Sequence, residues 1–314
     1  MPWPLWLLTS CSDQVVVSAS PTGEFDAPED ASLWGLKEES NEPIDLIVRP
    51  AHVELTFSQF MSLLRRNDLN ASSLYLEYFP MFAAFQSCGG AGNKECDELL
   101  RQLPDYSFAS FLSKRYHLLW MGGGGCRGDP DSVGTPSSSG WSCLPNSRMH
   151  YDRMENLMTV LVGSKTFHLY DPSQSHHLHG GEGVLSAAFS ATVRRTEAVG
   201  KRKSGVTRSD KARSSATSGD EMICQNETDT CSAAQSHLSA QSPIDIVFHR
   251  DPAKLITERN TYHTYSPVNI RKPNLTRYPR FEHARGMQCT VHAGDTIFVP
   301  AHWWHEVWLP CQHH

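Results

Sequence analysis

The chain has 314 residues, enough for one large domain or two small ones. Its hydrophobic fraction of 39% is low for a globular chain and predicts that part of it is not packed. The net charge of −6 gives no overall electrostatic case for nucleic-acid binding. No apolar run approaches the roughly 18 residues that a membrane helix needs. The nine cysteines include no Cys-x-x-Cys pair, which argues against a zinc module and favours reduced thiols in the cytosol or nucleus.

The first part of the chain alternates short strands with one amphipathic helix. Residues 56–59 form a capping-box pattern, and apolar residues follow at helical spacing, so a helix is predicted over 57–66. Extended segments are predicted at 14–18, 49–55, 72–78 and 118–121, and a short helix at 97–103.

Two stretches interrupt an otherwise single domain spanning 1–314. Residues 122–145 are rich in Gly, Ser and Pro and predict a loop. Residues 174–243 have few aromatics and an excess of small polar residues, so we expect a disordered insertion. Its basic cluster at 201–203 fits a solvated loop or a nuclear-targeting signal.

The central motif is His150-x-Asp152 in a segment that reads as a strand. Residues two apart in a strand point to the same face, so these two side chains could hold one metal ion. An apolar β-branched run at 157–162 and a Gly-Ser turn follow, and Lys165 then opens a second strand over 166–170. The alternative is a surface strand with solvated polar residues.

A His-x-Asp triplet is weak evidence alone. The chain has 16 histidines, and roughly one such triplet is expected by chance. A second copy at 249–251 precedes Pro252, which cannot donate to a strand ladder, and no apolar hairpin follows it. We treat this second copy as the chance one.

A third imidazole follows a Gly-Asp turn, a short apolar strand and the pair Trp303-Trp304 near the C-terminus. With His150 and Asp152, His305 would complete two histidines and one carboxylate. That facial set leaves coordination positions open and suits non-haem Fe(II) oxygenases, with zinc as the competitor. The alternative for His305 is a packed core histidine beside the two tryptophans.

Together, His150-x-Asp152, Asn156, Lys165 and the Gly-Asp…Trp-Trp-His305 ending resemble the JmjC (cupin-type) 2-oxoglutarate oxygenases. The likeness is greatest to the small JmjC protein hydroxylases, including the Jumonji domain-containing protein seven-like lysyl hydroxylases. It implies a mostly β fold with flanking helices, built as a double-stranded β-helix (jelly-roll or cupin) barrel. The chain ends at His314, nine residues after His305, so we expect it to lack the family's last strand.

The resemblance also implies roles for individual residues. His150, Asp152 and His305 would hold Fe(II), where the co-substrate 2-oxoglutarate and dioxygen react. The far carboxylate of 2-oxoglutarate needs a cation, and a lysine facing inward is costly unless it meets an anion. The residues implied in co-substrate binding are Tyr75, Ser147, Asn156 and Lys165. The alternatives are an ordinary core tyrosine for Tyr75 and a solvent-facing residue after a turn for Lys165.

The implied activity is hydroxylation of a protein side chain, with lysine as the first expectation. A histone lysine demethylase, a cupin-like binding or scaffold protein with impaired turnover, and a zinc hydrolase stay as alternatives. The expected partner is a protein substrate, without direct nucleic-acid binding or a membrane, and a homodimer is left open.

Overall fold

The fold is described from a computed structural model. The described residues are 14–36, 44–65, 74–80, 118–122, 125–128, 141–144, 146–181, 184–195, 244–256 and 264–309. The helix predicted at 97–103 lies outside them. Contacts divide the chain into one unit of Met1–Val193 with Ile246–His314, and a second unit, Arg194–Asp245, which covers most of the predicted insertion. The first unit carries the architecture and the candidate site.

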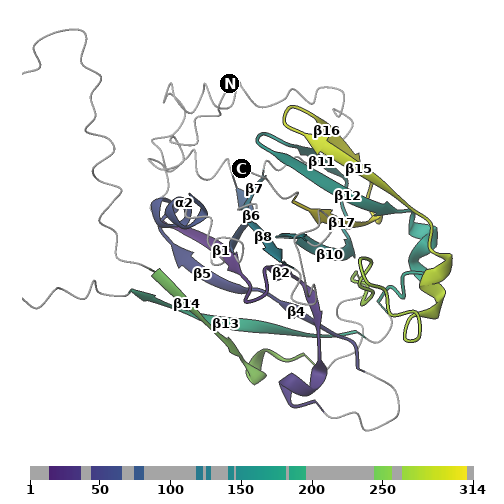
Figure 1. The fold of residues 1–314 in the computed structure, drawn as a ribbon, viewed down its shortest axis with the longest axis horizontal. Helices are drawn as coiled ribbons and strands as arrows, with labels where there is room; N and C mark the ends of the chain where they lie inside the picture. The colour runs from purple at the N-terminus through teal and green to yellow at the C-terminus, as the bar shows by residue number, and fades with distance from the viewer. Residues whose placement is uncertain are drawn as a thin grey trace, which may run out of the picture. The chain divides into compact units, whose positions relative to one another are not determined.

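The first sheet, which we call the N-terminal sheet, has the strand order β5-β1-β6-β7 (Figure 1). Its strands are β1 (Val15–Ala19), β5 (Ala51–Leu55), β6 (Leu74–Pro80) and β7 (Leu118–Gly122). Burial alternates along β5 and at the start of β1: Val17 is fully buried, whereas Val16 is 53% exposed. One face of this sheet is therefore apolar core, and the other carries the more polar residues.

The helix α2 (Phe57–Arg65) follows β5 and contributes to the core. Its Phe57 and Phe60 are buried. The backbone N–H of Thr56 donates to the side chain of Gln59, and the N–H of Gln59 donates to the hydroxyl of Thr56. This reciprocal pair is the predicted capping box, and it satisfies amide groups that the first helical turn leaves without partners.

The second sheet, which we call the histidine sheet, has the strand order β15-β12-β17-β10-β2. Its strands are β2 (Glu24–Phe25), β10 (Asn146–Tyr151), β12 (Ser164–Tyr170), β15 (Gly286–His292) and β17 (Trp304–Trp308). A short antiparallel ribbon of β11 (Asn156–Thr159) and β16 (Thr296–Val299) shares an apolar cluster with it. Phe167 and Val291 of the sheet and Val299 of the ribbon are buried in that cluster.

A third sheet has the strand order β14-β13-β4-β3. Its strands are β3 (Ala27–Glu29), β4 (Leu46–Arg49), β13 (Leu185–Arg195) and β14 (Ile244–Arg250). Short 3-10 helices lie at Ala31–Trp34 (η1), Pro172–His176 (η4), Pro252–Lys254 (η7) and Pro279–His283 (η8). The second His-x-Asp triplet falls at the end of β14, where Asp251 caps η7, in agreement with its reading as a chance match.

The structure corrects the boundaries of both predicted insertions. The stretch predicted as a loop contains the paired strands β8 (Gly125–Gly128) and β9 (Trp141–Leu144). The stretch predicted to be disordered from 174 onward begins with ordered residues, including the whole of β13. Composition missed β13 because its small residues bury their surface against β4, a pairing that is far away in sequence.

The ordered start of the second stretch is held by the histidine sheet. Trp304 Nε1 donates to Ser175 Oγ at 2.8 Å, and a Cβ added at Gly180 would collide with the Trp304 ring. Trp304 is 1% exposed and packs with Leu178 and Met149. These contacts fix residues 172–181, whose composition alone does not predict order.

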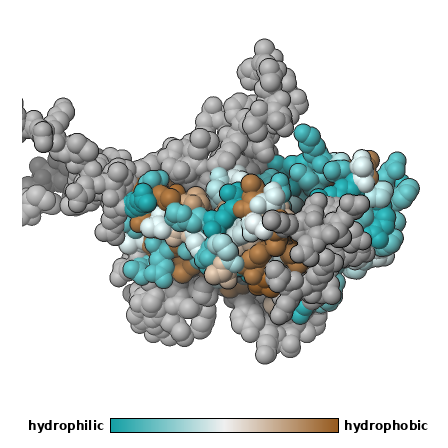
Figure 2. Space-filling view, turned by 90° about the horizontal axis from the view of Figure 1, so that it is seen from below, coloured by the Kyte–Doolittle hydropathy of each residue, from teal (hydrophilic) through white to brown (hydrophobic). Residues whose placement is uncertain are grey.

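The prediction of a mostly β architecture with few helices is confirmed. No described helix has the length and apolar character of a membrane span. Figure 2 shows hydrophobic residues gathered near the centre of that view, with mostly hydrophilic residues at its right-hand side. The last described strand is β17, and the predicted lack of a further strand stays a prediction.

Candidate metal centre

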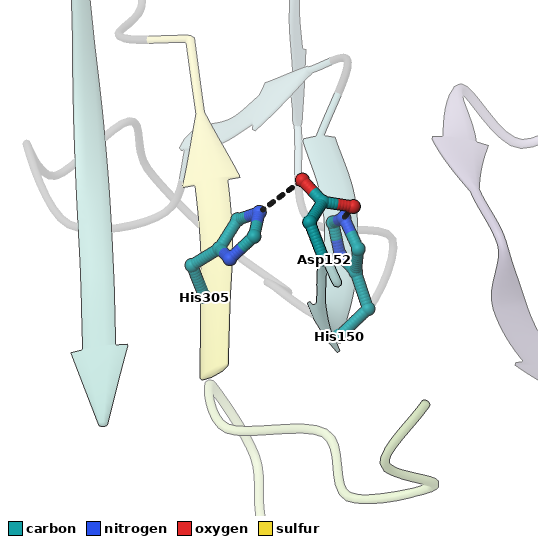
Figure 3. A group of neighbouring side chains, drawn as sticks. All are labelled: His150, Asp152 and His305. Carbon is teal, nitrogen blue, oxygen red and sulfur yellow. Dashed lines mark ion pairs between the residues drawn. The ribbon is translucent and has the colours of Figure 1, made fainter. Parts of the chain in front are cut away.

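Two histidines and one aspartate converge where β10 and β17 lie side by side. The strands are antiparallel, and His150 and His305 are directly opposed, so their side chains share a face (Figure 3). Asp152 Oδ1 lies 4.0 Å from His150 Nε2, and Asp152 Oδ2 lies 3.7 Å from His305 Nε2. The candidate ligand atoms all lie within 4.8 Å of one another, close enough to hold one metal ion.

Backbone carbonyls orient both imidazoles. His150 Nδ1 lies 2.7 Å from the carbonyl of Arg148, and His305 Nδ1 lies 3.0 Å from the carbonyl of Trp303. A carbonyl can only accept, so each Nδ1 carries a proton, and Nε2 is the nitrogen that each ring presents to Asp152. Burial, with His150 nearby, lowers the pKa of His305 to about 4 and keeps that ring neutral. Two imidazole nitrogens and one carboxylate are a donor set that fits Fe(II), with zinc also suited to such donors.

Asn156 positions the carboxylate. Asn156 is the first residue of β11, and its Nδ2 donates a hydrogen bond to Asp152 Oδ2 at 2.7 Å. The backbone carbonyl of Asp152 also accepts from the N–H of His302 at 2.7 Å. Asn156 was predicted to bind the co-substrate, and the structure gives it a direct contact with a candidate metal ligand.

Lys165 and Tyr75 join the two main sheets. Lys165 Nζ of β12 donates to Tyr75 Oη of β6 at 2.9 Å. Burial lowers the pKa of Lys165 to about 8, and it raises the pKa of Tyr75. Lys165 also shares the face of His305, because β12 pairs Leu169 with His305 and Lys165 precedes Leu169 by two strand periods. A desolvated cation beside a neutral hydroxyl is a suitable receptor for a carboxylate.

Ser147 also lies on β10, where it pairs with Phe25 on one side and Val307 on the other. The register of β10 against β17 shifts between Ser147 and His150. Among the described residues no hydrogen bond joins Ser147 to Lys165 or Tyr75. The structure therefore brings Lys165 and Tyr75 together but does not join Ser147 to them.

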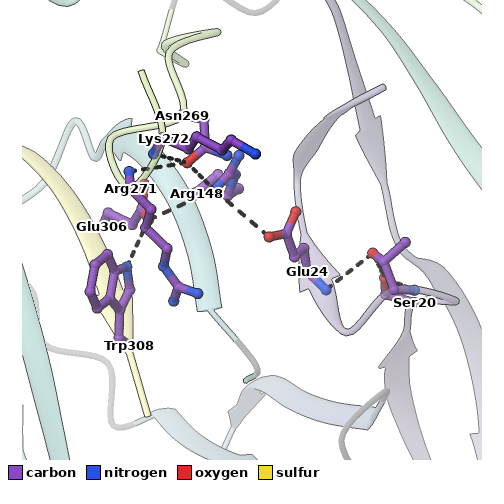
Figure 4. Close-up of polar contacts among 9 residues, drawn as sticks. Ser20, Glu24, Arg148, Asn269, Arg271, Lys272, Glu306 and Trp308 are labelled. Atoms are coloured by element: carbon purple, nitrogen blue, oxygen red, sulfur yellow. Dashed lines mark hydrogen bonds and ion pairs between the residues drawn. The ribbon is translucent and has the colours of Figure 1, made fainter. Parts of the chain in front are cut away.

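Sequence reasoning missed a charged network centred on Arg148 (Figure 4). Arg148 is 4% exposed, and its Nη1 lies 3.8 Å from Glu24, 4.0 Å from Glu306 and 3.4 Å from Asn269 Oδ1. Glu306 is fully buried, and its Oε1 accepts from Trp308 Nε1 at 2.7 Å. Desolvation raises the pKa of Glu306, while Arg148 opposes this.

This network lies behind the candidate metal centre. Adjacent residues of a strand point to opposite faces, so Glu306 faces away from His305. The carbonyl of Arg148 accepts from His150, so the same residue supports a candidate ligand through its backbone. That Glu306 points away from His305 could be predicted from the alternation of side chains along a strand, but its contact with Arg148 could not.

Tyr265 forms a further contact of the candidate centre. Its ring stacks on His150 with 5.5 Å between centroids and 21° between planes, and its hydroxyl donates to Asp26 Oδ2 at 3.1 Å. No sequence motif indicated this residue, because the contact depends on a bridge between distant backbone segments.

The fold and the site define a cupin-type β protein with a candidate two-histidine, one-carboxylate metal centre. Residues 9–311 match the family model described as "Cupin-like domain", and the chain belongs to that family. The JmjC proteins of this family include 2-oxoglutarate oxygenases. The predicted cupin fold class is thereby confirmed.

Short segments of the chain resemble named JmjC proteins. The chain is 48% identical over 40 residues to human "tRNA wybutosine-synthesizing protein 5", covering 13% of each chain. It is 42% identical over 41 residues to human "Bifunctional peptidase and (3S)-lysyl hydroxylase JMJD7", again 13% of each. It is 42% identical over 45 residues to "Lysine-specific demethylase JMJ31" of Arabidopsis thaliana, covering 14% of this chain and 8% of the relative. The matched stretches thus span a small part of each relative, and the relatives' names differ in substrate and reaction.

Proposed function

We propose that this protein is an Fe(II)- and 2-oxoglutarate-dependent dioxygenase that hydroxylates a side chain of a protein substrate, with lysine as the target. The observation that supports it is the convergence of two imidazoles and a carboxylate on the face that also carries the desolvated Lys165. A buried lysine without a carboxylate contact is unfavourable by itself, and an anionic co-substrate would compensate it.

In this proposal His150, Asp152 and His305 hold Fe(II). When bound, the iron with 2-oxoglutarate and dioxygen supplies the oxidation that places one oxygen atom in a C–H bond, with succinate and carbon dioxide as co-products. Lys165 and Tyr75 bind the far carboxylate of 2-oxoglutarate, and Ser147 is proposed as a further hydroxyl for it. Asn156 keeps Asp152 turned toward the two imidazoles through its 2.7 Å hydrogen bond.

Lysine demethylation is the second candidate, since one of the matched relatives is named a lysine-specific demethylase. The two reactions share all the residues above and differ in product. A mass gain of one oxygen on a substrate peptide supports hydroxylation, whereas loss of a methyl group supports demethylation. We also propose that the substrate is a protein and that the enzyme works in the cytosol or nucleus. A homodimer is a further possibility under the same proposal.

The decisive experiment is a thermal-shift titration with Mn(II) and N-oxalylglycine, a non-reacting 2-oxoglutarate analogue. A ligand present at 100 times its dissociation constant adds about 2.7 kcal/mol of apparent stability. We expect the wild type to gain this shift, Asp152→Ala to lose the part that depends on metal, and the wild type with Fe(II) to release succinate from 2-oxoglutarate.

Two results would contradict the proposal. A folded wild type without any response to Mn(II) and N-oxalylglycine would favour a cupin-like binding or scaffold protein. A response to Zn(II) alone, without succinate release under Fe(II), would favour a zinc hydrolase.

A further inference from the structure

A β-bulge lies in β6, close to Tyr75. Tyr75 pairs with Gly122 and Leu76 with Met121, but the next pair is Phe79 with Leu119. Two residues, Glu77 and Tyr78, therefore oppose the single residue between Leu119 and Met121, which is Trp120. Tyr78 also adopts a φ of 52°, a left-handed conformation that costs a bulky residue of order 1–3 kcal/mol.

The bulge directs three side chains toward the candidate metal centre. Tyr75 points across to Lys165, which shares the face of His305. Glu77 is two residues after Tyr75, and Trp120 is two residues before the partner of Tyr75, so both lie on that face. The two residues of a bulge that face a single partner residue point to the same side of the strand, so Tyr78 lies on the same face as Glu77.

Glu77 has no hydrogen-bond or ion-pair partner among the described residues. Burial raises its pKa to about 8, with Asp26 acting in the same direction and Arg49 and Lys165 opposing. A carboxylate held in such surroundings gains when a cation arrives. Nothing in the proposed chemistry of the metal or of 2-oxoglutarate uses this residue.

The aromatic pair supplies a second cation-attracting element. The rings of Tyr78 and Trp120 lie 5.3 Å apart at 62°, and Tyr78 is 58% exposed. Aromatic faces attract ammonium groups, and tryptophan does so most strongly. An exposed aromatic beside an unpaired carboxylate on one face therefore favours a cationic ligand over a neutral or acidic one.

We propose that Glu77, Tyr78 and Trp120 form the specificity subsite that receives the ammonium group of a target lysine. This inference rests on the proposed function, because the face is shared with the candidate metal centre. Glu77 binds the ammonium as its counter-ion, and the Tyr78–Trp120 pair covers it. The strained bulge is the device that brings all three side chains to the metal-facing side of β6 and β7.

The test uses two small probes that differ in charge. Nα-acetyl-lysine amide and Nα-acetyl-norleucine amide are added in turn to the full chain loaded with Mn(II) and N-oxalylglycine. NMR then measures the broadening of the probe's terminal side-chain protons by the paramagnetic Mn(II). We expect strong broadening for lysine, little for norleucine, and about tenfold weaker lysine binding in Glu77→Gln, because a hydrogen bond to a charged group is lost.

Matched variants separate a local contact from a general field. Glu54→Gln removes the same charge from β5, which lies two strands away from β6 in the same sheet, at about 10 Å. This variant should bind lysine as the wild type does. Trp120→Leu should weaken lysine binding and leave the thermal shift with Mn(II) and N-oxalylglycine intact. That shift also shows that each variant is folded.

Equal broadening of lysine and norleucine, or an unchanged response in Glu77→Gln, would overturn the subsite. Failure of the wild type to bind Mn(II) and N-oxalylglycine would instead overturn the proposed function. In that event saturation transfer from the metal-free protein to the two probes still decides the subsite: a preference for lysine that Glu77→Gln abolishes supports it, and equal transfer rejects it.

Discussion

Lys165 is held in surroundings that disfavour its charge. Its pKa in the folded protein is about 8, below the ordinary value of 10.5, and desolvation is the main cause. The folded state therefore prefers the neutral amine. Above pH 10.5 Lys165 does not reduce the free energy of unfolding, and as the pH falls from 10.5 to 8 that free energy decreases. At neutral pH Lys165 lowers the free energy of unfolding, which agrees with the binding role that we propose for it.

Lys165→Met should accordingly stabilise the ligand-free protein by about 1–3 kcal/mol at pH 7, with the gain shrinking between pH 8 and 10.5. The same variant should lose the thermal shift with N-oxalylglycine while keeping the part caused by Mn(II). Urea unfolding across this pH range, together with the thermal-shift titration, measures both effects. A destabilised variant that still binds N-oxalylglycine would contradict the assigned role.

Asn156 contacts the candidate metal ligand Asp152, so we propose that it affects metal binding through this carboxylate. Asn156→Ala removes the 2.7 Å hydrogen bond that orients the carboxylate, so we expect metal affinity to fall about 10–100-fold. Calorimetric titration with Mn(II) gives the affinity. Asn274→Ala is the control, because within the described part of the chain that side chain accepts only from the local backbone N–H of Arg277. Equal affinities in the two variants would show that Asn156 does not position the ligand.

At the scale of elements, the register of β10 against β17 decides whether the two histidines meet. The buried Arg148–Glu306 pair joins these strands on the face opposite the histidines. Removing one charge of a buried pair leaves the other uncompensated, which costs about 3–5 kcal/mol, whereas replacing both costs much less. We therefore expect the pair to contribute more to the unique register of the strands than to net stability.

We expect Arg148→Met to lower the free energy of unfolding by about 3–5 kcal/mol, and the double variant with Glu306→Gln to recover a large part of it. The introduced amide oxygen would still accept from Trp308. The control is Arg250→Met, whose partner Glu29 lies 3.3 Å away while Arg250 is 42% exposed, so that its loss should cost less than about 1 kcal/mol. Urea denaturation of the four proteins tests this, and a double variant as unstable as the single one would refute it.

At the scale of the whole molecule, the candidate centre and nearly all of the described fold belong to one unit, and residues 196–243 lie outside the description. β13 ends at Arg195 and β14 begins at Ile244, and the two strands are neighbours in one sheet. A connection between neighbouring strands can be short, and loop length has a small effect on stability, about 0.6 kcal/mol for each doubling.

Replacing residues 196–243 with a flexible linker of about ten Gly and Ser residues should therefore keep the fold and the thermal shift with Mn(II) and N-oxalylglycine. The full chain, measured in parallel, is the reference. Loss of the shift in a shortened protein that remains folded would show that the removed segment contributes to the site.

Features that depend on local spacing could be predicted from the amino-acid sequence. The capping box at 56–59 and the shared face of His150 and Asp152 follow from helical and strand periodicity, which neighbours along the chain set. The C-terminal motif with His305 was equally readable, since its turn, apolar run and aromatic pair are contiguous. A mostly β cupin-type fold followed from these motifs through their resemblance to a family.

Contacts between residues far apart in the chain could be seen only in the folded structure. It opposed His150 to His305, brought Lys165 to Tyr75, buried Arg148 beside Glu306, and ordered β13 in a stretch whose composition predicted disorder. It also placed the bulge that turns Glu77 and Tyr78 toward one face. Each of these depends on strand pairing or on packing between sheets, and both join segments far apart in the chain. The register of paired strands is fixed by burial of whole faces rather than by local sequence.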